Sequence, residues 1–419
     1  MPIEPTTSDG VPRVVRRRLL QGAAAGALLA AAGALRAQDD PVRIGVPTAL
    51  DQPEGRDTVD AVQMAVAEIN GAGGLLGRQL EVEAADETLD PRDGVAAIES
   101  LTGERKVDVL VGGYTSGVTL AQLHRVAAAR TVFLSCGGAS PAITQRVLED
   151  YDRFKYVFRV HPLNAAHQAR ALVEFIAGFL VAEMRYTRIA LVGENDRWVE
   201  SLMPVLARNA AAVGAEVRLS EIVARETTDF SPLLARIQGS GAHFVFTLFA
   251  HAASDRFVQQ WADSGVTALI GGIDARATRP EFFASVQGDA AGQIVAGFAV
   301  RAPVTPRTVP FWDAFVAKTG RPGPAPAAMG AYDAVHVFAE AVRRAATLES
   351  DALIQALRQT DHAGVTGRIQ FDERHDVKAG AGLTNLLFSQ WQESGERVVL
   401  WPQELRSGKP FVPPLRRRS

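Results

Sequence analysis

The sequence predicts an α/β protein built from two doubly wound lobes, each with a parallel sheet. Apolar runs typical of strands alternate with runs of helical spacing from Val42 to Val160, as in doubly wound folds. The same alternation starts again after His161-Pro162, where X-Pro disfavours a continuing helix. At 419 residues the chain is also longer than one hydrophobic core usually supports.

The first lobe is expected to begin with a strand and a helix that Asp57 or Thr58 caps and that runs to Asn70. Asp90 before Pro91 predicts the start of the next helix, since proline is favoured at the first helical position. A further helix is spaced over residues 120–127. The expected strands of this lobe are 42–47, 79–84, 107–111, 132–134 and 156–160.

Two loops of this lobe carry the central functional prediction. The strand at 107–111 runs into Tyr114-Thr115-Ser116-Gly117, and the strand at 132–134 runs into Cys136-Gly137-Gly138-Ala139-Ser140. In open parallel sheets, ligands bind beyond the carboxyl ends of the strands. Amides at a helix N-terminus beside a serine hydroxyl suit a carboxylate or another electron-rich oxygen. We therefore predict that these loops hold one end of a small ligand. Ser116 is also a candidate helix N-cap, which is compatible with that role.

The second lobe follows the same rules, with Asn164 and Asp229 as expected helix caps. A strand at 294–300 is expected to return toward the first lobe, and residues from Pro402 read as a loose tail. The expected strands are 188–192, 217–223, 243–248, 268–271, 294–300, 367–371 and 384–392, the last forming a hairpin with 398–401. The expected helices of this lobe are 164–179, 199–213, 230–238 and 252–264, and the helices expected after the strand at 294–300 are 308–319, 330–346 and 350–359.

The N-terminus indicates export. Arg16-Arg17-Arg18-Leu19-Leu20-Gln21 resembles a twin-arginine signal, followed by an uncharged stretch too short and too weakly apolar for a membrane span. We predict a signal peptide over 1–37, cleaved after Ala34 or Ala37, and a periplasmic product with a net charge near −6. That charge gives no reason to expect nucleic acid. The one cysteine, Cys136, excludes an intrachain disulfide and is expected to be a small buried side chain rather than a reactive thiol.

Several short segments together resemble a known family. They are Arg43-Ile44-Gly45, the run from Ala65 to Gly77 that ends Ile-Asn-Gly-x-Gly-Gly-Leu-x-Gly, Asp90-Pro91, Val157-Phe158-Arg159-Val160, Tyr332-Asp333-Ala334 and Gly367–Asp372. In this order and spacing they resemble the periplasmic solute-binding proteins of ABC importers, of the leucine/isoleucine/valine-binding type. The resemblance covers about Val42 to Trp401. It implies two lobes joined by three crossovers that close on a solute.

The resemblance also implies roles for single residues. Ser116 falls at a serine that holds the ligand carboxylate, and Gly137 and Gly138 fall where backbone groups complete that clamp. Ala139 falls at a threonine, with Ser140 next to it, while Trp198 falls at an aromatic that covers the ligand. Glu54 falls at another aromatic position, and the acidic partner of a ligand ammonium maps near Asp274. These departures leave amino acids, aromatic or aliphatic acids, amides and urea-like solutes open.

His251 and Asp274 both end strands of the second lobe, so we count them with Glu54, Thr115 and Trp198 as candidate ligand contacts. Motifs of hydrolases, zinc proteases and nucleotide-binding loops are absent from the sequence, and the eight histidines show no i, i+4 pair. We therefore predict a binding protein rather than an enzyme, with no catalytic residues, no cofactor and no metal. A periplasmic hydrolase using Ser116 is disfavoured, because no motif places a histidine beside it.

The predicted function is a receptor that delivers a small polar solute to an inner-membrane ABC permease. A ligand-sensing partner of a membrane signalling protein is the alternative that the sequence leaves open. We expect a monomer. The predicted domains are a signal peptide (1–37), lobe one (42–160 and 298–366), lobe two (161–297 and 367–402) and a C-terminal tail (403–419).

Overall fold

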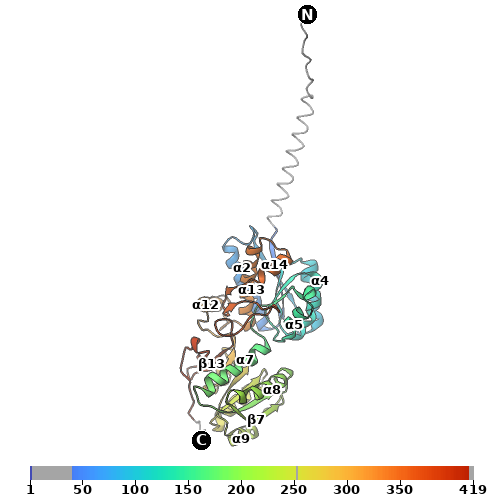
Figure 1. The fold of residues 1–419 in the computed structure, drawn as a ribbon. Coiled ribbons are helices and arrows are strands. Elements are labelled where there is room, and N and C mark those ends of the chain that lie inside the picture. Colours follow the sequence, from blue (N-terminus) through green and yellow to red (C-terminus); the bar gives the residue numbers. More distant parts are fainter. Residues whose placement is uncertain (2–39, 252, 415–419) are drawn as a thin grey trace.

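The computed structural model describes Met1, residues 40–251 and residues 253–414, so the predicted signal peptide and its cleavage site lie outside the described residues. The chain forms two α/β lobes, each with its own mainly parallel sheet. Figure 1 shows the helices α2, α4, α5, α13 and α14 around one lobe and α7, α8 and α9 around the other. Among the described residues, no helix is long and apolar enough to cross a bilayer.

The first sheet has five parallel strands in the order β2-β1-β3-β4-β5. Its strands are β1 (Val42–Thr48), β2 (Leu80–Asp86), β3 (Val109–Gly112), β4 (Val132–Ser135) and β5 (Val157–Arg159). The helices of this part of the chain are α2 (Pro53–Gly71), α3 (Pro91–Glu99) with the π-helical turn η1 (Ser100–Glu104), α4 (Ser116–Ala129), α5 (Ala142–Glu149) and α6 (Tyr151–Phe154). Later in the chain come α12 (Thr308–Thr319), α13 (Pro326–Ala345) and α14 (Ser350–Leu357).

The second sheet has seven strands in the order β14-β13-β10-β9-β8-β6-β7. Its strands are β6 (Arg188–Glu194), β7 (Glu216–Val223), β8 (Phe244–Phe249), β9 (Leu269–Asp274), β10 (Ile294–Gly297), β13 (Leu387–Trp391) and β14 (Arg397–Trp401). Its helices are α7 (Ala165–Phe175) with η2 (Ile176–Val181), α8 (Arg197–Ala212), α9 (Ser231–Ser240), α10 (Ala253–Ser264) and α11 (Phe282–Ser285). Strands β13 and β14 form the predicted antiparallel hairpin at one edge.

Four expectations about these elements are wrong. Asp229 is not the N-cap of α9, since Phe230 holds that position and the Asp229 carboxylate accepts from the N–H of Ser231. Helix α2 begins at Pro53 with Gln52 as N-cap, because proline suits the first helical position, so Asp57 and Thr58 lie inside the helix. Strand β10 does not return to the first lobe, because it pairs with β9 and β13 of the second sheet. The segment after Pro402 is not loose over residues 403–414: η3 (Gln403–Leu405) follows β14, and Arg406 then makes a bidentate ion pair with Glu183.

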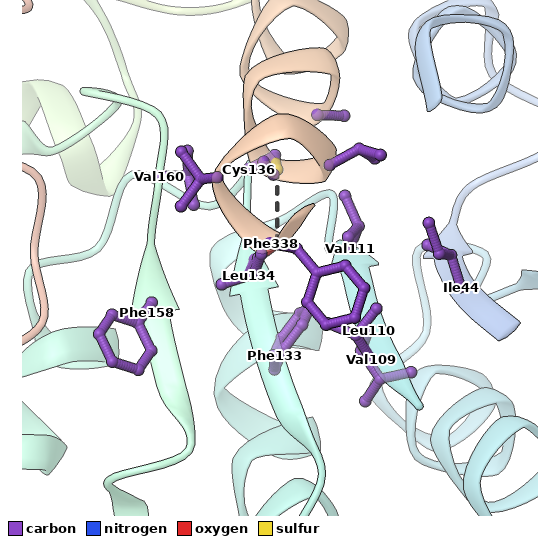
Figure 2. Close-up of a cluster of buried hydrophobic side chains, with 14 of the residues drawn as sticks. Ile44, Val109, Leu110, Val111, Phe133, Leu134, Cys136, Phe158, Val160 and Phe338 are labelled. Carbon is purple, nitrogen blue, oxygen red and sulfur yellow. Dashed lines mark hydrogen bonds between the residues drawn. The ribbon is translucent and has the colours of Figure 1, made fainter. Parts of the chain in front are cut away.

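Each lobe has its own hydrophobic core. The first core joins β1, β3, β4 and β5 to α2 and α13, and Cys136 lies in it among apolar side chains beside the helix that carries Phe338 (Figure 2). Burial raises the pKa of the Cys136 thiol, which donates to the carbonyl of Leu134 (3.4 Å). Cys136 is thus a buried core side chain, as predicted, because a desolvated thiolate is disfavoured.

Three crossovers join the lobes: one after β5, one after β10 and one before β13. At the third, the short hairpin of β11 (His362–Ala363) and β12 (Arg368–Ile369) lies on the first-lobe side, where Ile369, Phe371 and Val377 belong to the first core. The predicted domain boundaries stay a prediction, but these three side chains, assigned to lobe two, pack in lobe one.

Candidate functional site: the cleft between the lobes

Each sheet has a point where its strand order reverses, and such points are where ligands bind in open α/β sheets. In the first sheet, β1 lies between β2 and β3, so the reversal falls between β1 and β3. The chain after β1 leads to Glu54, and the chain after β3 leads to Thr115 and Ser116. In the second sheet the reversal falls between β6 and β8, whose ends lead to Trp198 and His251. The four strands that flank the two reversal points, β1, β3, β6 and β8, are therefore each followed by a predicted site residue.

The two first-lobe loops touch each other. The backbone N–H of Ser140 donates to Ser116 Oγ (3.0 Å), and the N–H of Gly138 donates to the carbonyl of Tyr114 (3.1 Å). Gly137 lies so close that an added Cβ would stand 2.3 Å from the carbonyl oxygen of Gly113. The predicted loop residues Thr115, Ser116 and 137–140 are thus brought together, as the sequence analysis required.

Ser116 is not the helix cap. Thr115 is the N-cap of α4, and its hydroxyl oxygen accepts from the N–H of Val118 (3.4 Å). Because Ser116 Oγ accepts from Ser140, its own proton can still be donated to another oxygen. In the described part of the chain, the amides of Ser116, Gly117 and Ala139 have no acceptor. Three N–H groups and one hydroxyl therefore suit a carboxylate or amide oxygen.

A buried carboxyl supports this loop from below. Glu87 accepts from Gln122 Nε2 of α4 (2.6 Å), and the backbone of Tyr114 also contacts it. Burial raises the pKa of Glu87 to about 7, although the bonds from Gln122 and Tyr114 act in the opposite direction. The hydrogen bond between Glu87 and Gln122 is thus fully buried, next to the backbone of Tyr114 in this loop.

Arg159, a fully buried residue at the end of β5, ties the second loop to the crossovers. Its guanidinium donates to the carbonyl of Ser140 (2.5 Å) and to the carbonyl of Leu163 (3.3 Å) in the first crossover. It also lies 3.7 Å from the carboxylate of Asp376, just before the third crossover. Burial lowers the pKa of Arg159 while Asp376 raises it. The loop at 137–140 is thus connected to two of the segments that join the lobes.

The predicted residues of the second lobe occupy the ends of β6 and β8. Trp198 lies in the first turn of α8, partly buried against the second-lobe core. Its backbone N–H donates to the carboxylate of Asp196, the N-cap of this helix (3.4 Å). His251 is held by the buried Glu194, whose carboxylate accepts from His251 Nδ1 (2.6 Å) and from the amides of residues 250 and 251. Since Glu194 acts as the acceptor, Nδ1 carries the proton and Nε2 is the nitrogen available to a partner.

Glu194, Asp196 and His251 bring ligand atoms within 4.8 Å of one another, a spacing that a metal ion can bridge. Their oxygens are already in use, because Asp196 caps α8 and pairs with Arg225 (2.5 Å) while Glu194 accepts three N–H groups. A cation would have to displace these donors. We therefore assign no metal to this cluster, and the predicted absence of a metal stays a prediction.

Asp274 ends β9 and is almost fully buried. Its carboxylate accepts from Ser254 Oγ (2.5 Å), Gln293 Nε2 (3.0 Å) and the amides of residues 276 and 277 (3.1 Å each). Burial raises its pKa to about 6, and these bonds oppose that rise. All the strong acceptor positions are thus used inside the second lobe, where Asp274 shapes the turn at 275–278.

A cavity of about 590 Å³ lies between the lobes, a size typical of small-molecule sites. Glu54 and Asp274 line it, together with the crossover residues Leu163 and Phe298 and, from the first lobe, Trp312. The loops at 113–116 and 137–140 do not line it. They are linked to its edge by the hydroxyl of Tyr114, which donates to Glu54 (3.3 Å).

Three residues of this region were missed by sequence reasoning. Tyr114 lay within the predicted loop, and its partner Glu54 is 60 positions away, so the chain gives no local signal for the contact. Arg279 pairs with Glu54 from the other lobe, 225 positions away. Arg159 was part of a recognised segment, but the carbonyls that it binds carry no side-chain pattern.

Comparison with known proteins shows the family to which the chain belongs. The model of a family described as periplasmic binding protein matches residues 41–396. A leucine-, isoleucine-, valine-, threonine- and alanine-binding protein of Pseudomonas aeruginosa is 26% identical over 322 residues, 75% of this chain and 80% of that protein. Leu/Ile/Val-binding protein homolog 1 of Brucella abortus is 23% identical over 385 residues, 91% of this chain and 98% of that protein.

Solved structures show the same fold. A structure from Silicibacter pomeroyi matches with a TM-score of 0.81 at 19% identity, over 90% of this chain and 100% of its own. A branched-chain amino acid transporter substrate binding protein from Streptococcus pneumoniae, in complex with isoleucine, matches with a TM-score of 0.68 at 22% identity, over 86% and 100%. A solute binding protein of an ABC transporter from R. palustris, in complex with benzoate, matches with a TM-score of 0.66 at 17% identity, over 86% and 96%.

Two mainly parallel-sheet lobes around a cleft define a type I periplasmic binding protein, a class of binding proteins rather than enzymes. The chain belongs to the periplasmic binding protein family, among the Leu/Ile/Val-binding type of ABC transporter substrate-binding proteins.

Proposed function

We propose that this protein binds a small solute carrying a carboxylate or amide group, either an amino acid or a related acid or amide, and delivers it to an inner-membrane ABC permease. The predicted twin-arginine signal would place it in the periplasm. The observation that carries the proposal is the contact between the loops at 113–116 and 137–140 through Ser116 and Ser140. That contact gathers, at the reversal point of the first sheet, the Ser116 hydroxyl and amides that have no acceptor among the described residues.

In this proposal the first lobe holds the oxygens of the solute and the second lobe closes over the remainder. Ser116, the amides of Gly117 and Ala139 and the neighbouring Thr115, Gly137, Gly138 and Ser140 form the first-lobe side. Trp198 and His251 contribute from the second lobe, with an aromatic face and with Nε2 respectively. Micromolar affinity requires about 8 kcal/mol, so burial of the solute must add to the ~1.5–3 kcal/mol expected of one charge-assisted hydrogen bond.

The solute is left as a class because the site departs from the amino-acid pattern. Ala139 lacks a hydroxyl, Glu54 replaces a ring, and the carboxylate of Asp274 is enclosed by donors of its own lobe. An ammonium group would therefore need another acceptor, for which His251 Nε2 is the candidate. The relatives and structures that resemble this chain bind aliphatic amino acids in some cases and benzoate in another.

Native mass spectrometry of the periplasmic protein, followed by release and identification of its solute, tests the proposal. We expect one copy of a small acid, amino acid or amide per chain, and a saturable change in tryptophan fluorescence when the emptied protein is titrated with it. Silence across amino acids, aromatic and aliphatic acids, amides and urea would contradict the proposal. So would turnover of the bound solute.

A further inference from the structure

An ion pair spans the cleft between two side chains that come from different lobes. Glu54 lies in the first turn of α2 in the first lobe, and Arg279 lies in the turn that follows β9 in the second lobe. The guanidinium of Arg279 donates to one carboxylate oxygen of Glu54. Both side chains line the cavity between the lobes. We call this contact the interlobe ion pair.

The first lobe holds Glu54 in position for this contact. The hydroxyl of Tyr114 donates to its second carboxylate oxygen (3.3 Å). Burial, and after it the charge of Glu54, raises the pKa of Tyr114 to about 12, so the phenol remains a donor in neutral solution. Tyr114 belongs to the loop at 113–116, so the interlobe ion pair is linked to the proposed solute site by one hydrogen bond.

The two arginines of this turn, Arg276 and Arg279, pair with carboxylates of different lobes. Arg276, three residues earlier, also lines the cavity, but it pairs with Asp255 of its own lobe through two bonds of 2.5 and 2.6 Å. Arg279 instead reaches across to the other lobe. The turn thus carries one arginine that stabilises its own lobe and one that joins the lobes.

From this geometry we propose that Glu54 and Arg279 hold the two lobes together before the solute arrives and thereby raise the affinity of the cleft. A contact made by both lobes at once favours the closed arrangement over the open one, whatever else occupies the cleft. If the closed form binds the solute, apparent affinity follows its population in the empty protein. The affinity part of the inference rests on the proposed function; the effect on lobe separation does not.

The expected effect on lobe closure is modest, because the side chains of Arg279 and Glu54 keep 43% and 26% of their surface exposed, respectively. Ion pairs of this exposure are screened by solvent and salt. We expect their loss to lower the ratio of closed to open molecules about two- to fivefold. High salt should do the same to the unmodified protein.

The test measures lobe separation without solute. Spin labels at Arg92→Cys and Arg208→Cys, exposed positions in α3 and α8, report the distance between the lobes, and the native Cys136 is buried. We expect Glu54→Gln and Arg279→Gln each to move molecules from the shorter to the longer distance by the stated factor. The exchanged pair, Glu54→Arg with Arg279→Glu, should restore the shorter distance.

A matched control removes an ion pair of similar exposure inside one lobe. Arg236 pairs with Glu221 at 3.3 Å, with 51% and 33% of the side chains exposed, and Arg236→Gln should leave the distances unchanged. Identical distances in wild type, Glu54→Gln and Arg279→Gln would overturn the inference. Equal shifts in the Arg236→Gln control would also overturn it.

Titration with the solute that copurifies separates this inference from the proposed function. If the distances shift and affinity weakens by the same factor, both stand. If the distances shift but no small solute binds, the proposed function fails while the ion pair still holds the lobes. If affinity falls while the distances stay fixed, Glu54 and Arg279 contact the solute directly, and the proposal that they hold the lobes together is wrong.

Discussion

At the scale of single residues, the hydroxyl of Ser116 has two roles in the proposed site. Its oxygen is occupied by the N–H of Ser140, and its proton remains to be donated. The same hydroxyl therefore joins two loops and offers a bond to the solute. The oxygen of a helix N-cap accepts from an amide of its own helix, and Thr115 performs that role here by accepting from Val118.

We predict that Ser116→Ala weakens solute binding about tenfold or more, which corresponds to ~1.4 kcal/mol per decade. The variant removes a donor to the solute and the acceptor of the Ser140 amide. Isothermal titration with the copurified solute measures the affinity, and circular dichroism checks that the fold is kept. Ser116→Thr, which keeps the hydroxyl, should recover most of the affinity.

The matched control is Ser350→Ala, since Ser350 also begins a helix of the first lobe. Its neighbour Asp351 pairs with Arg130, just before β4 starts, so this serine lies at the opposite end of the sheet from the loops. Its affinity should equal that of wild type. Unchanged affinity in Ser116→Ala would remove Ser116 from the site.

Glu87 provides a pH test beneath the same loop. Burial raises its pKa from about 4.5 to about 7, so the folded state binds a proton more tightly than the unfolded state. Its contribution to stability is complete below pH 4.5 and is lost as pH rises through 7. Relative to wild type, Glu87→Gln should therefore become more stable by about 2 kcal/mol between pH 5 and pH 8.

Urea unfolding of both proteins at the two pH values measures this difference. The variant keeps the shape of the side chain but cannot ionise. A difference in unfolding free energy that is the same at pH 5 and pH 8 would show that the Glu87 carboxyl does not titrate in this interval. The test is independent of any solute.

At the scale of elements, the two loops must approach closely, and Gly137 permits it. An added Cβ at this position would stand 2.3 Å from the carbonyl oxygen of Gly113 and 2.7 Å from that of Tyr114. Gly137→Ala should push the loops apart, destabilise the protein by about 1–3 kcal/mol and weaken solute binding more than tenfold. Thermal unfolding and titration measure the two effects.

The control for Gly137 is Gly239→Ala in α9, where an added Cβ meets no atom of the described residues within 4 Å. Alanine in a helix is favoured over glycine by about 0.5–1 kcal/mol, so this variant should be slightly more stable and bind as wild type does. Equal losses in both variants would show that general strain, and not the separation of the loops, causes the effect.

The elements themselves were largely predictable, for reasons that differ along the chain. The caps Asp90 and Asn164 act as predicted, because a side-chain oxygen next to a helical pattern is a local signal. The start of α2 was misplaced because Pro53 outweighed two good capping residues further on. Strand β10 was misassigned because its apolar run does not reveal which sheet it joins.

At the scale of the whole molecule, the architecture followed from the repeated alternation of strands and helices, but the contacts between lobes did not. Residues after strand ends are candidates because carboxyl ends of parallel strands share one edge, and their contact with a solute stays a prediction. The pairing of Glu54 with Arg279, and the joining of Ser140 to the first crossover by Arg159, depend on positions far apart in sequence. No local pattern encodes such pairs.

Closure is the property that unites these scales. Arg159 connects the loop at 137–140 to the segments between the lobes, and Glu54 connects the loop at 113–116 to the second lobe through Tyr114. A solute oxygen held by the two loops would therefore lie next to both connections. The free energy of binding and the position of the lobes are coupled only to the extent that both lobes touch the solute.

A crystal structure of the protein with its copurified solute shows most directly whether the two first-lobe loops hold an oxygen of the solute. We expect an oxygen of the solute within hydrogen-bond distance of Ser116 Oγ and of at least one amide of Gly117 or Ala139, with Trp198 or His251 on its other side. A solute that occupies only the cavity beside Phe298 and Trp312, out of reach of both loops, would contradict it.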